Sequence, residues 1–553
     1  MTNQFSLETR ATLISSLRSG PLDLLVIGGG VTGAGILLDA HTRGMKVGLV
    51  EMQDFAAGTS SRSTKLVHGG LRYLKQFDVS LVAEVGKERA IVYENGPHVT
   101  TPLWMLLPIV QGGTYGMFMS SVGIYVYDRL AGVKESERRQ MLTVAQTLEK
   151  EPLLRREGLR GAGFYVEYQT DDARLTLEIL KEAVERGAVA LNYSKVEKLI
   201  YNERGRVAGA QIKDVLTDEI YSVYARKVLN ATGPWVDELR DMDRSKRRKT
   251  MHLTKGVHIV VDGQRFPLHN PVYFDVPDGR MVFAIPRDGK TYVGTTDTDY
   301  VGNPVSPRTS KADRDYLIGC VNFMFPSVAL GAQDVESVWA GVRPLIHEEG
   351  KAPSEISRKD EIFISPSGLI TIAGGKLTGY RKMADKVVSL IADELGSETH
   401  RQFPPCSTDQ IALSGGKFGG SEHMPSYLLD KIALGVGLGL TEQQATQLVH
   451  RYGTNIDLVY DEIRNEDNVV ERFGLPMDVF GSLMYGIQHE MVVTPSDYLV
   501  RRTAAMFFDI NWVQKWKEPV IRFMTQILKW SQEEEQRNRA ELERNIAEAT
   551  EVI

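Results

Sequence analysis

The N-terminal part of the chain shows the hydrophobic pattern of a strand, a helix and a second strand. Residues 22–27 are a short apolar run, typical of a strand buried on both faces of a parallel sheet. A glycine-rich turn at 28–33 follows, and then a helix to about Arg43. A second strand at 46–50 ends on an acid, Glu51, so the pattern predicts a βαβ unit.

Farther along the chain, helical spacing gives way to alternation. Residues 171–186 predict an amphipathic helix that ends at Gly187. Runs at 257–261, 281–286 and 292–296 alternate between apolar and polar residues, which indicates an antiparallel sheet rather than further βαβ units. The other predicted strands lie at 188–191, 207–212 and 370–373.

The last part of the chain has a different pattern. Residues 397–425 are rich in Gly, Ser and Pro and predict a linker. Beyond them the spacing is helical: Thr441 and Gln444 form a capping box, and Pro495 occupies a first helical position. Residues 537–552 predict a polar helix dense in Glu and Arg. We therefore expect an all-helical C-terminal region.

Composition narrows the class of protein without defining it. Of 553 residues, 42% are hydrophobic and 25% charged, which excludes a disordered chain, a collagen and a coiled coil. A net charge of −6 gives no reason to expect a nucleic-acid partner. The two cysteines, Cys320 and Cys406, lack metal-ligand spacing, so we expect no metal site and a reducing compartment. Glycine, with 51 residues, is in slight excess.

Two segments bear on the location of the protein. Residues 1–20 are polar and lack the apolar core of a signal peptide, so we expect a cytoplasmic protein. Residues 99–127 carry no formal charge, but prolines and glycines interrupt them too often for a membrane-spanning helix. We interpret this stretch as buried sheet and domain interface, and a surface that dips into a bilayer is the alternative.

The first glycine turn is predicted to bind a dinucleotide. Gly28 permits the tight turn, Gly30 lets backbone N–H groups approach a pyrophosphate, and Gly33 lets the helix pack on the strand. The helix N-terminus adds partial positive charge for the phosphates. Glu51, at the end of the second strand, would accept hydrogen bonds from the ribose hydroxyls.

Two later glycine turns indicate FAD rather than NAD. Residues 229–235 place Gly233 in an Ala-Thr-Gly turn after a strand. At Gly374, Gly375 and Lys376 a further strand breaks into a helix, whose N-terminus suits the pyrimidine end of a flavin, where reduction places negative charge. Three widely spaced glycine turns predict an FAD-binding domain that a substrate domain interrupts.

A hydroxyl-rich turn at 58–65 is a further candidate for contact with FAD. Its serines would donate hydrogen bonds to the cofactor, and a purely structural turn is the alternative. The predicted contacts in and after this turn are Ser60, Ser61, Ser63, Lys65, His68 and Gly70.

A series of short motifs covers most of the chain. They are GTSSRSTK at 58–65, LVHGGLRYL at 66–74, NATGPW at 230–235, KGVH at 255–258, GTTD at 294–297, GVRPL at 341–345, GGKLTGYR at 374–381 and DYLVRRT at 497–503. In this order they closely resemble the FAD-dependent, quinone-linked (aerobic) glycerol-3-phosphate dehydrogenases, from about residue 22 to 386 and into the helical tail. One departure is Gly379, where many members are expected to have a hydroxyl residue, and it affects only a role for that side chain.

The resemblance implies a flavoenzyme that oxidises sn-glycerol 3-phosphate to dihydroxyacetone phosphate. Hydride would pass from C2 to flavin N5, and the electrons would then pass to a membrane quinone. A glycerophosphate oxidase, which hands electrons to O2, is the nearest alternative. An amine or amino-acid oxidase, whose substrate also needs an anion clamp, and a flavin-binding sensor without turnover are the others.

Within this resemblance, residue chemistry suggests the roles at the site. His258 is the predicted general base because imidazole titrates near working pH; a core histidine is the alternative and His68 is the rival. Arg343 would bind phosphate or stabilise the developing charge on the C2 oxygen. Asp297 would orient a base or a substrate hydroxyl, or belong only to a turn. The predicted substrate contacts are Arg72, Tyr73, Arg343 and Lys376.

A quinone acceptor requires contact with a bilayer, and two segments are candidates. Residues 244–249 place five bases in six positions, which favours anionic lipid; a solvated loop is the alternative. Residues 512–530 combine basic and aromatic side chains; a helix packed on its own domain is the alternative. We expect a cytoplasmic protein that attaches reversibly to the inner face of the cell membrane, and a homodimer is left open.

The predicted fold class is α/β: a two-part Rossmann-like FAD-binding domain with an interleaved antiparallel-sheet substrate domain, plus an all-helical C-terminal domain. The chain would enter the FAD-binding domain three times. The predicted boundaries are an N-terminal extension at 1–20, the FAD-binding domain at 21–100, 160–240 and 340–396, the substrate domain at 101–159 and 241–339, the linker at 397–425 and the helical domain at 426–553.

Overall fold

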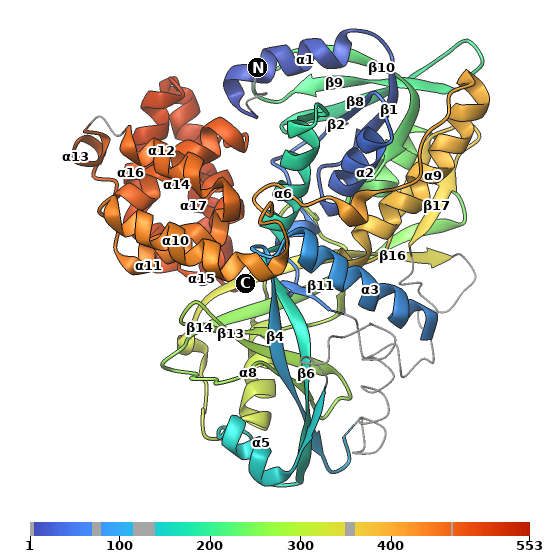
Figure 1. Cartoon of the computed structure of the whole chain (residues 1–553). Helices are drawn as coiled ribbons and strands as arrows, with labels where there is room; N and C mark the ends of the chain where they lie inside the picture. The colour runs from blue at the N-terminus through green and yellow to red at the C-terminus, as the bar shows by residue number, and fades with distance from the viewer. Residues whose placement is uncertain (1–4, 69–78, 114–138, 349–359, 466–467) are drawn as a thin grey trace.

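In the computed structural model, two β-sheets form the body of the molecule and a helical C-terminal region, orange to red in Figure 1, lies beside them. The structure describes residues 5–68, 79–113, 139–348, 360–465 and 468–553. Three predicted site residues, Gly70, Arg72 and Tyr73, lie outside these described residues.

The first sheet contains the predicted βαβ unit. Its strand order is β17-β18-β10-β1-β2-β7, and every neighbouring pair except β17 with β18 is parallel. All six residues of β1 are buried, Asp23 among them, as its mostly apolar sequence predicts for a strand inside a parallel sheet. The strands are β1 (Leu22–Ile27), β2 (Val47–Val50), β7 (Val189–Leu191), β10 (Ile220–Asn230), β17 (Glu361–Ile364) and β18 (Ile370–Ala373). In addition, β9 (Val207–Asp214) pairs antiparallel with β10, and β8 (Ser194–Tyr201) pairs antiparallel with β9.

Three helices that are far apart in sequence pack together beside this sheet. α2 (Val31–Thr42) contacts both α6 (Asp172–Glu185) and α9 (Tyr380–Thr399). Gly35 lets α2 approach α9 closely, because a Cβ on it would lie 2.7 Å from the ring of Tyr380. The first sheet is therefore completed by segments from three parts of the chain, as the interrupted domain predicts.

The second sheet is antiparallel apart from the contact of β4 with β12. Its order is β15-β11-β14-β13-β12-β4-β6-β3, with β16 paired to β11 and β5 to β6. The three alternating runs fall in β11, β13 and β14, which confirms the predicted antiparallel sheet. Its strands are β3 (Leu66–Val67), β4 (Thr100–Val110), β5 (Gln140–Leu142), β6 (Leu159–Thr170), β11 (Lys249–Asp262), β12 (Val272–Asp275), β13 (Met281–Arg287), β14 (Lys290–Gly294), β15 (Thr298–Asp299) and β16 (Val335–Glu348).

The boundaries of the two layers differ from the predicted ranges at three strands. β3 pairs with β6, β6 with β4 and β16 with β11, so all three belong to the second sheet, although 21–100, 160–240 and 340–396 were predicted to lie in the FAD-binding domain. β6 leads directly into α6, an element of the first layer, so no turn or change of composition marks the crossing. The remaining helices of the body are α1 (Arg10–Arg18), α3 (Val79–Asn95), α5 (Val144–Lys150), α7 (Val236–Met242) and α8 (Lys311–Met324).

The C-terminal region is helical, as predicted. The capping box is present, since Thr441 Oγ1 accepts a hydrogen bond from Gln444 N at 3.2 Å. The polar helix predicted at 537–552 is the larger part of α17. The helices are α10 (Met424–Gly437), α11 (Glu442–Tyr452), α12 (Ile456–Arg464), α13 (Val469–Phe473), α14 (Met477–His489), the π-helical turn η12 (Asp497–Arg502), α15 (Ala505–Phe508), α16 (Ile510–Ile527) and α17 (Gln532–Thr550).

The predicted linker at 397–425 is packed rather than extended into solvent. Leu413 is buried and its N–H donates to Asn95 O of α3 at 2.7 Å. The Asn95 side chain in turn donates from Nδ2 to Thr408 O at 2.9 Å. This segment therefore fastens the C-terminal region to the body.

The uncharged stretch at 99–127 is partly visible. Its first part forms β4, which pairs along its length with β6, and the part after residue 113 lies outside the described residues. Across the ranges that the structure describes, no helix combines the length and the apolar character that crossing a membrane requires. Cys320 and Cys406 are both unpaired.

Candidate active site

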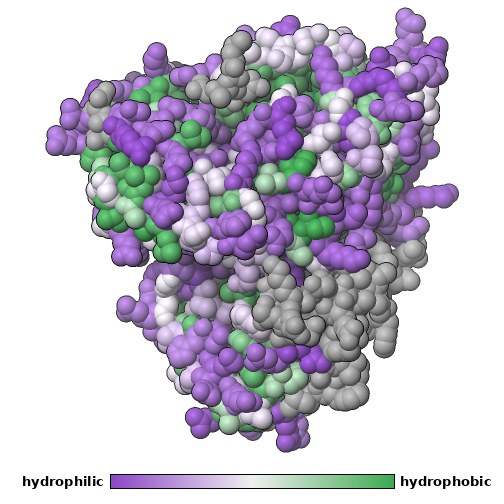
Figure 2. Space-filling model, viewed as in Figure 1, coloured by the Kyte–Doolittle hydropathy of each residue, from purple (hydrophilic) through white to green (hydrophobic). Residues whose placement is uncertain are grey.

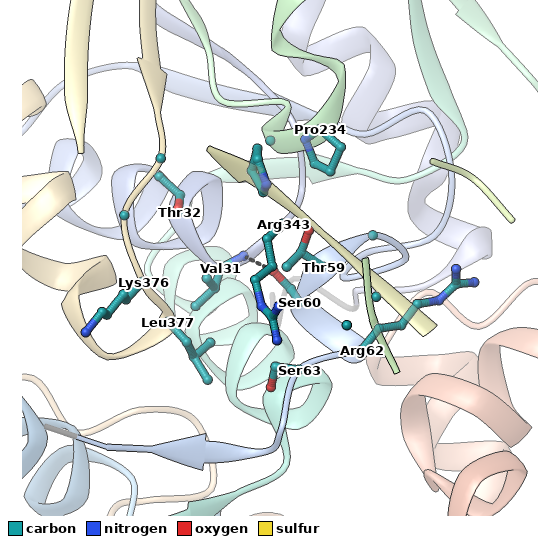
Figure 3. A pocket seen from close by; sticks show the side chains of 18 of the residues that line it. Val31, Thr32, Thr59, Ser60, Arg62, Ser63, Pro234, Arg343, Lys376 and Leu377 are labelled. Carbon is teal, nitrogen blue, oxygen red and sulfur yellow. Dashed lines mark hydrogen bonds between the residues drawn. The ribbon is translucent and has the colours of Figure 1, made fainter. Parts of the chain in front are cut away.

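A cavity of about 860 Å³ lies where the two sheets meet. The glycine turns of the first sheet form one side, and β11 with β16 form the other. Figure 3 shows Arg343 at the centre of the view, with Val31 from the start of α2 and Ser60 from the hydroxyl-rich turn around it, and Lys376 and Leu377 on a separate segment to the left. The predicted site residues in its wall are Gly28, Gly30, Glu51, Ser60, Ser63, His68, Gly233, His258, Asp297, Arg343, Gly375 and Lys376.

The turn between β1 and α2 consists of glycines because main-chain atoms approach one another closely there. Gly28 has a φ of +116°, and a Cβ on Gly33 would lie 1.9 Å from Gly28 O. Gly33 thus packs the helix on the strand and does not line the cavity. Gly30 is the N-cap of α2, and Ser60 Oγ accepts a hydrogen bond from Val31 N at 3.0 Å. The helix N-terminus therefore faces the cavity, where it favours phosphate.

The carboxylate of Glu51 is fixed by backbone donors at the end of β2. It accepts hydrogen bonds from Gly29 N at 2.7 Å and from Gln53 N at 2.9 Å. Burial raises the pKa of Glu51, and these two N–H groups oppose that rise. The carboxylate is thus held in the cavity wall beside the glycine turn, the position expected for a side chain that binds a ribose.

The hydroxyl-rich turn divides into two parts. Ser60 and Ser63 line the cavity, whereas Ser61 and Lys65 lie behind its wall. Lys65 Nζ donates to Ser61 O at 3.0 Å and pairs with Asp172 Oδ1 at 2.6 Å, with the lysine side chain 1% exposed. Lys65 therefore ties the turn to α6 and does not line the cavity.

His258 is buried in the wall that the second sheet supplies. Its Nε2 lies 3.0 Å from Thr64 Oγ1, and its ring stacks on Trp339 with centroids 4.6 Å apart. Nδ1 is buried and has no hydrogen-bond partner within the described ranges. Burial, together with the charges of Arg343 and Lys65, holds the pKa of His258 well below its usual value, so the imidazole is neutral at neutral pH.

The guanidinium of Arg343 is held by the turn after β14. Nη2 donates to Thr295 Oγ1 at 3.1 Å, and Nη1 donates to Asp297 Oδ1 at 3.2 Å and to Thr296 O at 3.3 Å. Gly256, on the neighbouring strand, makes room for it, because a Cβ there would lie 2.6 Å from Nη2. Asp297 thus pairs with Arg343, which fixes a cation in the cavity wall.

His68 and Lys376 lie in the part of the wall formed after β3 and β18. Burial and the charges of Lys376, Arg343 and Arg89 lower the pKa of His68 to about 3. Thr378 Oγ1 donates to His68 O at 3.2 Å and so joins the two segments. A neutral histidine among cations indicates a region of positive potential that suits an anionic substrate.

Some residues of this site were not singled out from the sequence. Thr64 and Thr295 lie inside recognised motifs and contact His258 and Arg343, and their motif positions could have identified them. Trp339 could not be found in this way. It faces His258 only because β16 pairs with β11 in the register that opposes these two residues.

One cluster of potential metal ligands lies outside the cavity. The ligand atoms of Asp39, Asp385 and Cys406 are within 4.8 Å of one another. Arg43 Nη2 donates to both carboxylates, at 2.7 Å and 3.0 Å, so a guanidinium already compensates their charge. The cluster is therefore explained as an ion-pair network.

Three separate glycine turns converging on one cavity, opposite a face that carries a neutral histidine and fixed cations, define an FAD-dependent oxidoreductase. The comparisons agree. A family model described as FAD dependent oxidoreductase matches residues 23–381, and a model described as C-terminal domain of alpha-glycerophosphate oxidase matches residues 406–535.

Similar proteins narrow this class. The aerobic glycerol-3-phosphate dehydrogenase of Bacillus subtilis is 56% identical over 549 residues, which are 99% of each chain. A crystal structure of the glycerol-3-phosphate dehydrogenase from Bacillus halodurans complexed with FAD is 52% identical, covers 99% of this chain and 98% of its own, and has a TM-score of 0.86. The chain therefore belongs to the family of aerobic glycerol-3-phosphate dehydrogenases, and FAD is its cofactor.

A more distant structure shares only the fold. The L-alpha-glycerophosphate oxidase from Mycoplasma pneumoniae, with FAD bound, has a TM-score of 0.54 at 18% identity and covers 70% of this chain and 97% of its own. An oxidase therefore shares the fold of this chain. The comparison gives no evidence about which molecule accepts the electrons.

Proposed function

We propose that the chain oxidises sn-glycerol 3-phosphate to dihydroxyacetone phosphate. The observation that carries the proposal is a neutral, buried His258 in the same cavity wall as the fixed cation Arg343. When bound, FAD supplies the acceptor for the hydride that leaves C2. The relatives bear the name of this activity, and the cavity residues supply the base and the anion contacts that the reaction needs.

His258 is the proposed general base. Because Nδ1 is buried, the proton of the C2 hydroxyl would be taken at Nε2, the nitrogen beside Thr64 Oγ1. Trp339 holds the ring in place by stacking, so the base needs no reorientation. Loss of that proton together with the C2 hydride leaves the ketone.

Arg343 and Lys376 are the proposed cationic contacts of the substrate. Thr295 and Asp297 orient the guanidinium of Arg343, which binds oxygen anions well because its planar fork donates twice. In the proposed arrangement Arg343 stabilises the charge that develops on the C2 oxygen and Lys376 binds the phosphate. Arg72 and Tyr73 remain proposed phosphate contacts outside the described residues.

Rapid anaerobic mixing tests the reductive half-reaction. Glycerol 3-phosphate should bleach the flavin absorbance of the purified holoenzyme, whereas glycerol, which lacks the phosphate, should be slower by about two orders of magnitude or more, the effect of losing charged hydrogen bonds. An amino acid such as glycine serves as the second comparison. Bleaching by the amino acid and not by glycerol 3-phosphate would instead favour the amino-acid oxidase alternative.

We further propose a quinone as electron acceptor. The name of the relatives, an aerobic dehydrogenase rather than an oxidase, supports this choice, although the C-terminal domain model takes its name from an oxidase. The two acceptors give different products. A soluble quinone analogue should be reduced at the rate of substrate turnover, with hydrogen peroxide below a few per cent of product; stoichiometric peroxide would assign the reaction to an oxidase.

Attachment to the membrane surface is proposed at the basic segment 244–249. Lys246 and Lys249 are paired with Asp241 and Glu361, but Arg247 and Arg248 are exposed and have no ion pair within the described residues. Figure 2 shows hydrophobic residues gathered at the left of that view, on the side where Figure 1 places the helical region. Elsewhere on this face they are scattered.

The second candidate segment is less suited to a bilayer. α16 directs Val513, Val520, Ile521 and Phe523 into its own domain, so much of its apolar face is already used. Flotation with vesicles rich in phosphatidylserine checks the assignment. Arg247→Glu with Arg248→Glu should abolish binding at low salt, while Lys515→Glu in α16 should leave it unchanged; the reverse result would move the contact to α16.

A further inference from the structure

The carboxylate of Asp54 is buried beneath the C-terminal region. Arg502 grips it with both terminal nitrogens, Nη1 to Oδ2 at 2.6 Å and Nη2 to Oδ1 at 3.0 Å, and Arg501 Nε donates to Oδ2 as well. Asn192 Nδ2 also donates to Oδ1, at 3.0 Å. Arg501 continues to Asp497 Oδ1 at 2.6 Å, and Arg502 Nε lies 3.7 Å from Glu490 Oε2, so the two arginines pair with three carboxylates. Such a forked, desolvated contact fixes position strongly.

The loop that carries Asp54 wraps the glycine turn of the FAD site. Three residues earlier, the Glu51 carboxylate binds Gly29 N, and two residues later Ala56 N donates to Gly29 O at 3.0 Å. The ring of Phe55 lies against Gly29, where a Cβ would be 2.8 Å from it. Asp54 is thus the point at which this loop is held from outside.

The helical turn η12, which carries Arg501 and Arg502, also holds a second segment of the cavity wall. Tyr193 OH donates to Asp497 Oδ1 at 2.7 Å, and the residues after Tyr193, at 194–197, line the cavity. Asp497 also accepts hydrogen bonds from Val493 N and Thr494 N, each at 2.9 Å, which fixes its own position. Residues 497–502 therefore bind both the loop at 51–58, through Asp54, and the segment at 193–197, through Tyr193.

We propose that Asp54, Arg501 and Arg502 are positioning residues for FAD, through which the C-terminal region holds the cofactor-binding loop at 51–58. The three residues lie outside the cavity wall and act through Glu51 and Gly29. The motif at 497–503, which the proposed chemistry does not use, thereby acquires a role. This inference concerns cofactor affinity and goes beyond the identity of the substrate.

Charge supports the geometry. The two arginines lower the pKa of Asp54 to about 2, so it stays ionised, and its negative charge contributes to raising the pKa of nearby Glu51. Neutralising Asp54 with Arg501 and Arg502 limits this repulsion. The link thus fixes the loop, and the charge that Asp54 places near Glu51 is itself paired with two guanidinium groups.

The dissociation constant of FAD from the full-length apoprotein, measured by flavin fluorescence, tests the proposal. Asp54→Asn should weaken FAD binding by about tenfold or more, since it removes charged hydrogen bonds that fix the loop. Arg502→Lys, which keeps the charge and loses the fork, should show a smaller rise and covers the case in which Asp54→Asn does not fold.

Glu185→Gln is the matched control. Glu185 of α6 binds the segment that leads into the C-terminal region, accepting hydrogen bonds from Ser414 Oγ and from Lys417 Nζ, each at 2.6 Å, and within the described residues these contacts do not reach 51–58. FAD affinity should stay within threefold in this variant. An equal loss in Glu185→Gln and Asp54→Asn, or affinity within threefold of wild type in both Asp54→Asn and Arg502→Lys, would overturn the proposal.

A reciprocal measurement separates positioning from simple stability. If FAD and the C-terminal region are coupled through Asp54, FAD must stabilise that contact as much as the contact favours FAD. Hydrogen exchange at residues 497–502 should slow on adding FAD to wild-type apoprotein, and this slowing should be lost in Arg502→Lys but kept in Glu185→Gln. Equal FAD-induced slowing in all three proteins would contradict the link.

Discussion

The two sides of the cavity meet a ligand in different ways. The first sheet presents backbone: a Cβ at Gly28 or Gly33 would meet main-chain oxygens, and Gly30 caps the helix whose N-terminus faces the cavity. The second sheet presents side chains, His258 and Arg343, each held by a threonine hydroxyl. One side is therefore defined by shape and the other by charge and proton affinity.

This difference teaches which substitutions each side tolerates. A backbone cradle cannot accept even a methyl group, because the atoms that would clash are themselves fixed by the sheet. A side-chain wall can lose one group and keep its fold. We expect damage to the first side to abolish FAD binding and damage to the second to spare FAD and slow the reaction, and the predictions below are ways to break that division.

The largest effect is expected for Gly33→Ala. Its Cβ would lie 1.9 Å from Gly28 O, and neither β1 nor α2 can move away without unpacking. The variant should purify without bound FAD, as the ratio of flavin to protein absorbance shows. Gly319→Ala, in α8 with no heavy atom within 4 Å of the new Cβ, is the control and should bind FAD normally.

Next in size is His258→Gln. Glutamine keeps a polar group near Thr64 but supplies no base, so flavin reduction by glycerol 3-phosphate should slow by about 10²–10⁴-fold with FAD still bound. Stopped-flow absorbance measures this rate. A normal rate of bleaching would show that another group is the base. The second sheet would then no longer be the side of the cavity that determines the rate of the reaction.

Arg343→Gln should reduce kcat/KM for glycerol 3-phosphate by about 10–100-fold, the usual scale of about 1.5–3 kcal/mol for hydrogen bonds to a charged group. FAD content should not change. Gly256→Ala sharpens the test, because its Cβ would displace Nη2 without removing the guanidinium, and a smaller loss of kcat/KM is expected. An Arg343→Gln variant within threefold of wild type would refute the proposed role.

The pH profile of flavin reduction tests the electrostatics of the same wall. The base works when neutral, so the rate falls as pH drops through the pKa of His258, and because that pKa lies below its usual value the acid limb should lie below about pH 6.5. His68, with a pKa of about 3, should not contribute. In Arg343→Gln, one positive charge fewer should move the limb to higher pH.

The smallest effect is expected for Gly379→Ser. A Cβ at Gly379 meets no heavy atom within 4 Å, and its backbone does not require glycine. FAD content and kcat/KM should stay within twofold of wild type. A large loss of FAD or of kcat/KM would show that a side chain is not tolerated even at a glycine with open space around it.

Local features of the fold could be predicted from sequence with good accuracy. β1 and β18 occupy the predicted residues, 22–27 and 370–373, because each is a short run of mostly apolar residues followed by glycine. The sheet to which β6 belongs could not be predicted, since a strand buried in either sheet has the same pattern.

The site shows the same limit. Glu51 and the glycines were accessible because their spacing is local, and FAD and the family followed from motifs. Lys65 was expected at the cofactor, yet it pairs with Asp172, 107 residues away. No local pattern reports such a partner. The stacking of His258 on Trp339 likewise depends on strand register, which sequence periodicity alone does not fix.

The ion pair between Asp54 and Arg502 joins residues that are 448 positions apart. At about 5–20 residues per second, a ribosome needs roughly 20–90 s to add the arginine after the aspartate. Throughout that interval the first βαβ unit exists with its loop unanchored and a carboxylate still in water. Cofactor loading is therefore expected to follow completion of the chain, so that a truncated product of translation would remain without flavin.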